Sequence, residues 1–169
     1  VDGMHICGLI INIFSSLFPS LLKRSFLKLM MTPIAKIKVS PSKMFTFYNE
    51  YEYQKKLEEL NDMKHEVKYF KGLGTSNDDE IKESFAEKVV QFVLDEKSID
   101  NLNLVFLKSM TNERKDWLLT VDEKKYVVPQ DTYPISQFLY QDFMKFSIDD
   151  NKRSIPMIFD GLKPSRSEE

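Results

Sequence analysis

The chain has 169 residues, of which 42% are hydrophobic and 30% are charged. These proportions are typical of a folded protein, argue against wholesale disorder and suffice for one sizeable core. The net charge is −2, so the chain as a whole lacks the basic excess that binds nucleic acid, and any contact with a polyanion must come from local basic groups. The single cysteine, Cys7, excludes an internal disulfide.

The first segment of the chain is apolar. Residues 6–22 contain no charged side chain, and this length is near that of a membrane span. Asn12, Pro19 and several serines interrupt the segment, and a proline breaks a helix. We therefore predict a buried helix over residues 5–18 and a short apolar stretch to Leu22, with no membrane partner. A protein anchored in a membrane by this segment is the alternative.

The next part of the chain has the patterns of an α/β unit. Residues 32–39 alternate branched apolar and basic side chains, and this period of two indicates a β-strand. A turn at residues 40–42 leads to a second predicted strand over residues 44–48. Residues 50–60 are helix-forming, with charges at helical spacing, and a third strand is predicted over residues 67–70.

Helices dominate the predicted second half. Cap residues and acids predict a helix over about residues 76–94, and a further helix is expected over residues 101–119. The segment 120–134 is polar and contains two prolines, which predicts a linker between domains. Residues 135–146 are expected to be helical and residues 147–153 to form a polar turn. Strands interleaved with helices, then helices alone, predict an α/β unit joined to a mainly helical one.

Two motifs carry residues suited to a metal or a phosphate. Asp2 precedes the first helix, where a carboxylate can hold Mg²⁺ if other carboxylates converge, although a cap or turn residue would fit equally well. Residues 71–76, Lys-Gly-Leu-Gly-Thr-Ser, offer a lysine, glycines that allow close backbone approach and hydroxyls at a helix start. Such a set suits a phosphate, and a structural strand-to-helix turn would have the same composition.

Basic residues in the second half are ambiguous when taken singly. Arg114 and Lys115 lie beside Trp117, where cations can contact phosphate or complement a helix dipole. Lys163 allows the same two interpretations. Tyr133 and Tyr140 have no neighbouring base or arginine pair that would support a nucleophilic role. One stripe of aromatic and methionine side chains is most simply core packing, namely Phe138, Tyr140, Phe143, Met144 and Phe146.

Taken in order, these motifs resemble the DNA-cleavage core of type II DNA topoisomerases along nearly the whole chain. Residues 2–6, Asp-Gly-Met-His-Ile, are similar to the end of the acidic motif of the TOPRIM metal-binding domain. Residues 69–76 are close to the family's Tyr-Tyr-Lys-Gly-Leu-Gly-Thr-Ser, and residues 114–118 are similar to its Arg-Lys-x-Trp-Leu. Residues 150–156 and 160–164 resemble the start of its winged-helix DNA-gate domain. The ordered set is far more specific than any single motif.

The resemblance implies a fold and a set of site residues. The C-terminal part of an α/β TOPRIM domain is expected over residues 1–119, a linker over 120–134, and the start of a mainly helical DNA-gate domain over 135–169. Asp2 is expected to be the third acid of the metal motif. DNA-backbone contacts are expected from Lys71, Arg114, Lys115, Arg153 and Lys163. Met4 and Cys7 stand where the family has serine and frequently lysine, so local polar contacts are expected to differ.

Enzymes of this family pass one DNA duplex through a transient double-strand break in another, with a tyrosine nucleophile, Mg²⁺ and ATP. The resemblance places the tyrosine beyond Glu169, and it places the ATPase domain and the remaining acids before Val1. The chain is therefore expected to be an internal, by itself inactive piece of a larger enzyme, with no catalytic residue of its own. The expected partners are double-stranded DNA and, for the parent enzyme, a second copy.

Lys71 and Lys163 lie on one chain, whereas gyrase-like enzymes carry the two corresponding regions on separate polypeptides. This favours the fused type of eukaryotes and large DNA viruses, and hence the nucleus or a viral replication site. After Pro164 the sequence departs from the family pattern of Gly or Ser followed by Gln-Arg-Lys. A non-catalytic DNA-binding protein, or the remnant of a decayed topoisomerase, is the alternative.

Overall fold

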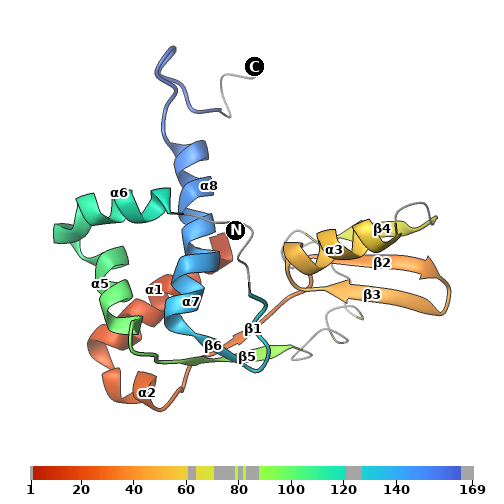
Figure 1. Cartoon of the computed structure of the whole chain (residues 1–169), viewed down its shortest axis with the longest axis horizontal. Helices are drawn as coiled ribbons and strands as arrows, with labels where there is room; N and C mark the ends of the chain where they lie inside the picture. Colours follow the sequence, from red (N-terminus) through yellow and green to blue (C-terminus); the bar gives the residue numbers. More distant parts are fainter. Residues whose placement is uncertain are drawn as a thin grey trace. The chain divides into compact units, whose positions relative to one another are not determined.

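The computed structural model describes residues 2–60, 64–70, 79, 82, 88–120 and 127–164, and of Asp2 only the backbone (Figure 1). The chain divides into two compact units. The helical unit comprises residues 1–27, 91–126 and 132–169, and the sheet-helix unit comprises residues 28–90 and 127–131. Each unit has buried residues of its own.

The N-terminal helix is central to the helical unit. Helix α1 (Asp2–Leu17) contacts α2 (Pro19–Lys23), α5 (Ser98–Phe106) and α8 (Met144–Ser154). Its apolar sequence was predicted to form a buried helix, but only one side of α1 is buried. Ile11 is 1% exposed, whereas five other large apolar side chains of the helix are 40% to 68% exposed, namely Ile6, Leu9, Ile10, Ile13 and Leu17. The described residues contain no helix that is long and apolar enough to cross a membrane.

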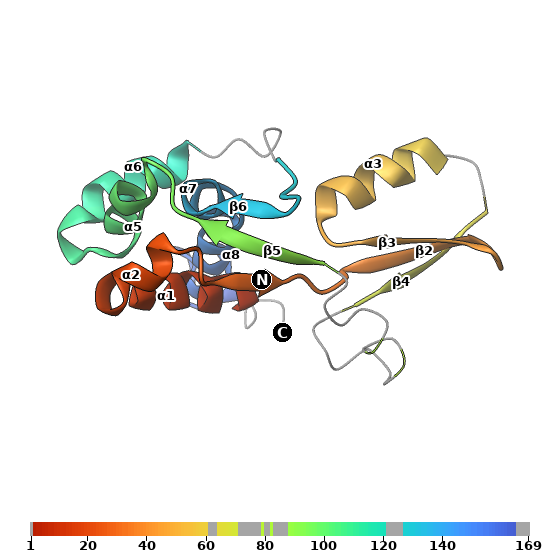
Figure 2. The same ribbon diagram turned by 90° about the horizontal axis from the view of Figure 1, so that it is seen from below.

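The C-terminal helices form one continuous helical segment, which is seen along its length in Figure 1 and nearly end-on in Figure 2. It begins with α7 (Ile135–Phe138), continues through the π-helical turn η4 (Leu139–Phe143) and ends with α8. Helix α6 (Thr111–Leu119) follows α5 after the 3-10 turn η2 (Lys108–Met110), and it contacts both α5 and α8. A helical second half is therefore confirmed.

Aromatic side chains form the centre of the helical unit. Phe92 and Tyr133 stack with 5.8 Å between ring centroids, and Phe138 meets both rings edge-on. These rings are 2% exposed or less. The predicted core stripe is confirmed for Phe138, Phe143, Met144 and Phe146, whereas Tyr140 is 45% exposed.

Gly8 marks a close crossing between α1 and η4. A Cβ atom at this position would overlap the ring of Phe143 and lie 3.5 Å from the ring of Phe106. Gly3 on the same helix differs, since a Cβ there would meet nothing within 4 Å. The glycine at position 8 is therefore required by packing, which the resemblance alone does not show.

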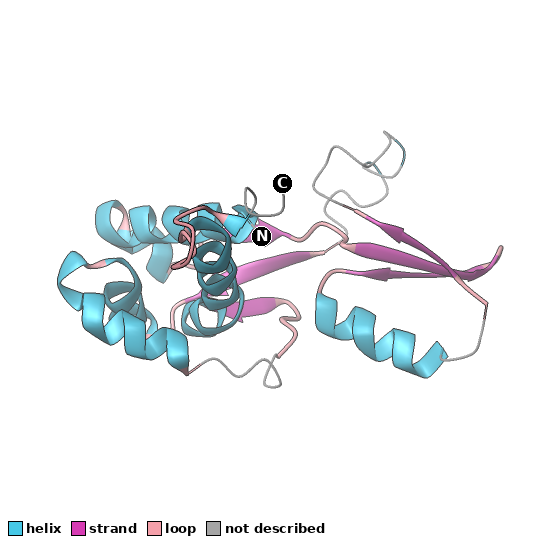
Figure 3. Ribbon diagram, turned by 90° about the horizontal axis from the view of Figure 1, so that it is seen from above, coloured by secondary structure: helices cyan, strands magenta, loops and turns pink. Residues whose placement is uncertain are grey.

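The sheet-helix unit contains three antiparallel strands covered on one face by a helix (Figure 3). The strand order is β3 (Lys43–Phe47), β2 (Ala35–Ser40), β4 (Glu66–Tyr69), and the helix is α3 (Glu50–Leu60). The core between them contains Ala35, Ile37, Phe47, Tyr53 and Leu60. All four elements lie within two or three residues of their predicted bounds, because period-two strands and a charged amphipathic helix are visible in sequence.

A second sheet has the order β1 (Lys28–Met30), β5 (Val89–Val93), β6 (Thr132–Pro134). Strands β5 and β6 are parallel, with Phe92 opposite Tyr133. A parallel pair needs a long crossover connection, and α5 and α6 lie within that connection. The sequence did not predict β1 or β6.

Three predicted boundaries are wrong. The helix predicted over residues 76–94 does not extend to its expected end, because residues 89–93 form β5. The valines and the phenylalanine of this segment favour a strand. Residues 76–78, 80, 81 and 83–87 of the predicted helix lie outside the described part of the chain. The helix predicted over residues 101–119 is interrupted at Leu107, whose backbone is extended. The predicted turn at 147–153 is instead part of α8, since polar residues suit the exposed side of a helix.

The division into compact units does not follow chain order, because segments before and after the sheet-helix unit belong to one helical unit. The predicted chain-order division, with a linker at residues 120–134, stays a prediction. The fold class is confirmed as an α/β part combined with a mainly helical part.

Candidate nucleic-acid interface

The structure describes four of the six predicted site residues, all of them in the helical unit. Arg114 and Lys115 lie on α6, Arg153 lies near the end of α8, and Lys163 follows a turn after α8. Lys71 and the side chain of Asp2 lie outside the described part of the chain. Helices α6 and α8 contact each other, so two of the predicted cationic segments belong to one packed framework.

Arg114 holds the end of one helix to the start of the next. Its Nε donates to the carbonyl of Leu104 at 3.1 Å, and its Nη2 donates to the carbonyl of Leu107 at 2.5 Å. These carbonyls lie at the C-terminal end of α5, where backbone acceptors lack helical partners. A guanidinium group has five N–H donors, so these two bonds leave donors and the full charge for a phosphate. Arg114 therefore combines a structural role with the capacity for an anion contact.

Lys115 is exposed on a helix that is anchored by its neighbour Trp117. Trp117 is 4% exposed and meets Tyr140 edge-on, with ring centroids 5.7 Å apart. Among the described residues its indole Nε1 has no hydrogen-bond acceptor. The buried indole packs α6 against the helical unit. Lys115 lies on this packed helix, and its side chain is exposed.

Arg153 donates from Nε to Oδ1 of Asp150 at 3.0 Å, one turn earlier on α8. Ser154 Oγ donates to the same oxygen at 3.0 Å. The bonds from Arg153 and Ser154, in that order, lower the pKa of Asp150, and the charge of His5 contributes further. Exposed ion pairs of this kind contribute little to stability, so a phosphate can replace the carboxylate as a partner of Arg153.

The motif before Lys163 is a tight turn. Gly161 has φ +68°, a conformation that favours glycine. Met157 N donates to the Leu162 carbonyl at 2.8 Å, and Leu162 N donates to Asp160 Oδ1 at 2.8 Å. Asp160 and Gly161 thus have structural roles, and the turn presents Lys163 as an exposed side chain.

Neither tyrosine considered as a nucleophile is suited to that role. Tyr133 is completely buried and donates from its hydroxyl to Asp142 Oδ2 at 2.7 Å. Tyr140 is 45% exposed and packs against Trp117. The part of the chain that the structure describes contains no group of three metal-ligating side chains, so those residues do not by themselves fit a Mg²⁺ ion.

Two lysines outside the sequence motifs are paired in the sheet-helix unit. Lys36 on β2 and Lys68 on β4 are directly opposite each other in the antiparallel ladder. The alternation of basic and apolar residues in β2 was the visible signal, but it was used only to predict the strand. Register, which pairs two lysines 32 residues apart in the chain, is not readable from that alternation.

Comparison with known proteins agrees with the order of the motifs. The family model described as the C-terminal associated domain of TOPRIM matches residues 30–151. A probable DNA topoisomerase 2 of Dictyostelium discoideum is 41% identical over 97% of the chain, and DNA topoisomerase 2 of Invertebrate iridescent virus 6 is 36% identical over 98%. Human DNA topoisomerase 2-alpha is 38% identical over 98% of the chain.

The chain spans only a small part of these relatives, namely 11%, 16% and 12% of their respective lengths. Its fold is similar to a crystal structure of the DNA-binding, cleavage and re-ligation domain of Plasmodium falciparum topoisomerase II. That match has a TM-score of 0.82 and 35% identity, and it covers 96% of this chain and 23% of the other. The chain therefore belongs to the family of the C-terminal associated domain of TOPRIM, in the form that type II DNA topoisomerases carry.

Proposed function

We propose that this chain is part of an ATP-dependent type II DNA topoisomerase, in which it binds the backbone of the DNA duplex that is cleaved. The observation that carries this proposal is the match to topoisomerase 2 proteins along nearly the whole chain. The framework is consistent with it, since Lys115, Arg153 and Lys163 are all exposed on one helical unit. Lys71 and Arg114 complete the proposed set.

These cations suit a backbone rather than base edges. Exposed ammonium and guanidinium groups bind phosphate oxygens, and phosphate contacts fix the register of a protein on DNA without reading its sequence. Because the net charge is −2, the chain has no overall positive charge to attract DNA, so the attraction must come from local basic groups such as these. Sequence-independent binding fits an enzyme that acts on DNA topology.

The chemistry is proposed for the parent protein. A tyrosine elsewhere in the parent would attack a phosphodiester, and ATP would drive strand passage. Asp2 would provide one oxygen ligand for Mg²⁺, but the ion needs several, so its other ligands would come from outside this chain. We further propose that the parent is a homodimer and that it acts in the nucleus or at a viral replication site. The proposed location is supported by relatives from a eukaryote and a virus.

The proposal is tested by the salt dependence of DNA affinity. Wild-type chain, Lys163→Ala and Lys115→Ala are titrated with two duplexes of unrelated sequence, and Lys55→Ala on α3 is the control for an exposed lysine outside the motifs. Each lost phosphate contact should lower the slope of log affinity against log salt by about 0.9. Both motif variants should weaken the two duplexes equally. Unchanged slopes, or a loss confined to one duplex, would show that the backbone assignment is wrong.

A further inference from the structure

One side of helix α1 leaves a row of large apolar side chains exposed. Five of them are 40% to 68% exposed, namely Ile6, Leu9, Ile10, Ile13 and Leu17. They follow one another mainly at intervals of three and four residues, so they share one side of the helix. We refer to these five residues as the α1 face.

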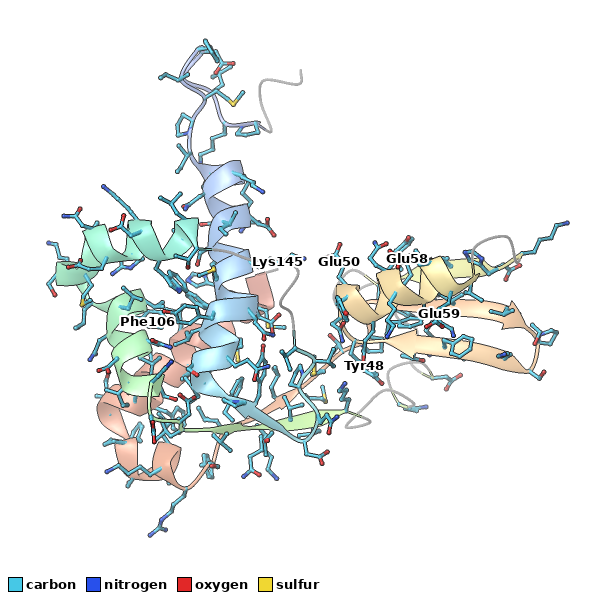
Figure 4. The ribbon with its side chains drawn as sticks, in the orientation of Figure 1. Tyr48, Glu50, Glu58, Glu59, Phe106 and Lys145 are labelled. Carbon is cyan, nitrogen blue, oxygen red and sulfur yellow. The ribbon has the colours of Figure 1, made fainter. Side chains whose placement is uncertain are left out.

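The other side of α1 is already packed into the helical unit. Ile11 is 1% exposed, and a Cβ atom at Gly8 would meet the rings of Phe143 and Phe106, of which Phe106 is labelled in Figure 4. A helix that is apolar on both sides belongs between two layers of structure. The helical unit provides one of these layers, and the described residues leave the α1 face without the other.

Aromatic rings extend the apolar surface at the C-terminal end of α1. The centroid of the Phe14 ring lies 5.6 Å from that of Phe18 and 6.2 Å from that of Phe26, and residues three apart on a helix, such as Phe14 and Leu17, are neighbours. Phe18 is 48% exposed and Phe26 is 61% exposed. Residues 6–22 carry no charged side chain. A contiguous exposed apolar surface of this kind marks an interaction site.

The chemistry of the α1 face selects an apolar protein partner. The face offers no cation to a nucleic acid, whose backbone attracts positive charge. Helices that lie on a lipid surface carry lysine and arginine on their polar side, whereas the opposite side of α1 is packed into the helical unit. Because Leu9 and Ile10 are adjacent, the α1 face is also wider than the two-position seam of a coiled coil, and this width is typical of a globular core.

We infer that the α1 face binds the part of the parent polypeptide that precedes Val1, and that the two form one hydrophobic core. Helix α1 begins at Asp2, so the preceding residues enter at the end of the helix where Ile6 lies. A partner that is joined to the helix by a short connection has a high effective concentration at this face. The inference rests on the proposed function, in which the chain is part of a larger enzyme.

The lengths of the relatives leave room for such a segment. The model of the C-terminal associated domain of TOPRIM matches from residue 30 onward, so α1 lies on the N-terminal side of that domain. The topoisomerase 2 relatives match over 97% to 98% of the chain, which includes α1, and yet the chain spans only 11% to 16% of their length. Burial of the α1 face would hold the first turn of the helix, and with it Asp2, against the preceding segment.

The test compares how fast a cysteine on the α1 face reacts with a maleimide in the 169-residue chain and in the parent, which is the chain extended through its own reading frame upstream of Val1. Ile13→Cys reports on the face, and Ile99→Cys on α5 is the matched control, because Ile13 is 49% exposed and Ile99 is 48% exposed. Peptide mass spectrometry distinguishes both from Cys7. The two cysteines should react at similar rates in the chain alone. In the parent, the ratio of the Ile13→Cys rate to the Ile99→Cys rate should fall at least about tenfold, because a covered thiol reacts only when the contact opens. An unchanged ratio would overturn the inference.

Hydroxyl-radical footprinting of the wild-type proteins provides a second measurement that does not depend on a variant folding. Leu17 is 68% exposed, and Leu119 on α6, the control, is 83% exposed. Oxidation of Leu17 relative to Leu119 should be lower in the parent than in the chain alone, and equal ratios would contradict the inference. Protection that disappears when the parent is diluted would assign the α1 face to a second copy. Protection that appears only with phosphatidylcholine vesicles would assign it to a lipid surface, and either result would overturn the inference.

The outcomes separate this inference from the proposed function. If the rate ratio falls in the parent while Lys115→Ala and Lys163→Ala keep the wild-type salt slope, the α1 face is covered as inferred and the backbone assignment is wrong. If these two variants lower the salt slope but the rate ratio is unchanged, the proposed function stands and the inference about the α1 face fails.

Discussion

Asp95 is predicted to be the carboxylate on which the junction between α5 and α7 most depends. Its Oδ1 accepts from Lys97 N at 3.0 Å, and its Oδ2 accepts from Ser98 Oγ at 2.8 Å and from Ser136 N at 3.1 Å. Each hydrogen bond to a charged acceptor is worth about 1.5 kcal/mol, and three such bonds end on the partly exposed Asp95 carboxylate. Asp95→Ala should therefore lower the free energy of unfolding by about 2 to 3 kcal/mol.

The assay is urea unfolding followed by the fluorescence of Trp117, the single tryptophan of the chain. The exposed neighbour Glu96→Ala is the control and should stay within about 0.5 kcal/mol of wild type. Equal midpoints for Asp95→Ala and Glu96→Ala would refute the reasoning, because the hydrogen bonds would then contribute no more than an ordinary surface residue.

The same carboxylate predicts how stability depends on pH. Burial raises the pKa of Asp95, but the hydrogen bonds from Ser98, Ser136 and Lys97 outweigh it, so the pKa is lowered from its ordinary value of 3.8. A lowered folded-state pKa contributes stability that is present above 3.8 and is lost as the pH falls through the folded value. The stability difference between wild type and Asp95→Asn should therefore shrink with acidification below 3.8. A difference that is constant or grows with acidification would contradict this assignment.

Three further predictions concern the helical unit and the chain alone. Gly8→Ala should lower the free energy of unfolding, measured by urea unfolding, by about 1 to 3 kcal/mol, because the new methyl group overlaps the Phe143 ring. Gly3→Ala is the control and should not destabilise the chain, because a Cβ atom there meets nothing within 4 Å. Burial and then the charge of Asp142 raise the pKa of the Cys7 thiol to about 12, so its alkylation at neutral pH should be slow until urea unfolds the chain. Purified chain with ATP and Mg²⁺ should not relax supercoiled plasmid, and relaxation would overturn its assignment as a part of the enzyme.

Local patterns in the sequence were sufficient for the strands and helices that have a clear period. The elements β2, β3 and α3 were predicted to within three residues because each buries one face and exposes the other. Strands β1 and β6 have three residues each, too few for a period to appear. They exist because β5 lies between them and pairs with both, and that information is not local.

The helical turns show the same limit. The polar residues 147–153 suggested a turn, but α8 continues through them because Met144 and Phe146 pack its beginning into the core. The π-helical turn over residues 139–143 was not predicted. It adds residues to one turn, and both Phe138 and Phe143 remain buried across it. Tertiary packing, rather than propensity, determines these bounds.

The candidate site was predictable in its residue types but not in their additional roles. Motif order alone selected Arg114, Lys115, Arg153 and Lys163 as DNA contacts, which stay predictions, and the structure describes all four as surface or half-buried cations. It could not reveal that Arg114 binds two carbonyls of α5. It also could not reveal the register that pairs two lysines across a sheet.

The double role of Arg114 decides which variants can test DNA binding. Arg114→Ala would remove a charge and also release the carbonyls of Leu104 and Leu107, so a loss of affinity could arise from a displaced α6 as easily as from a missing phosphate contact. Lysine does not rescue the position, because a single ammonium group cannot reproduce the planar fork of a guanidinium. Lys115 and Lys163 are exposed, and their removal leaves these carbonyl bonds in place. A change in the salt slope of DNA affinity on removal of Lys115 or Lys163 therefore reports on the phosphate contact itself. Variants at these two positions are the decisive test of the proposed interface.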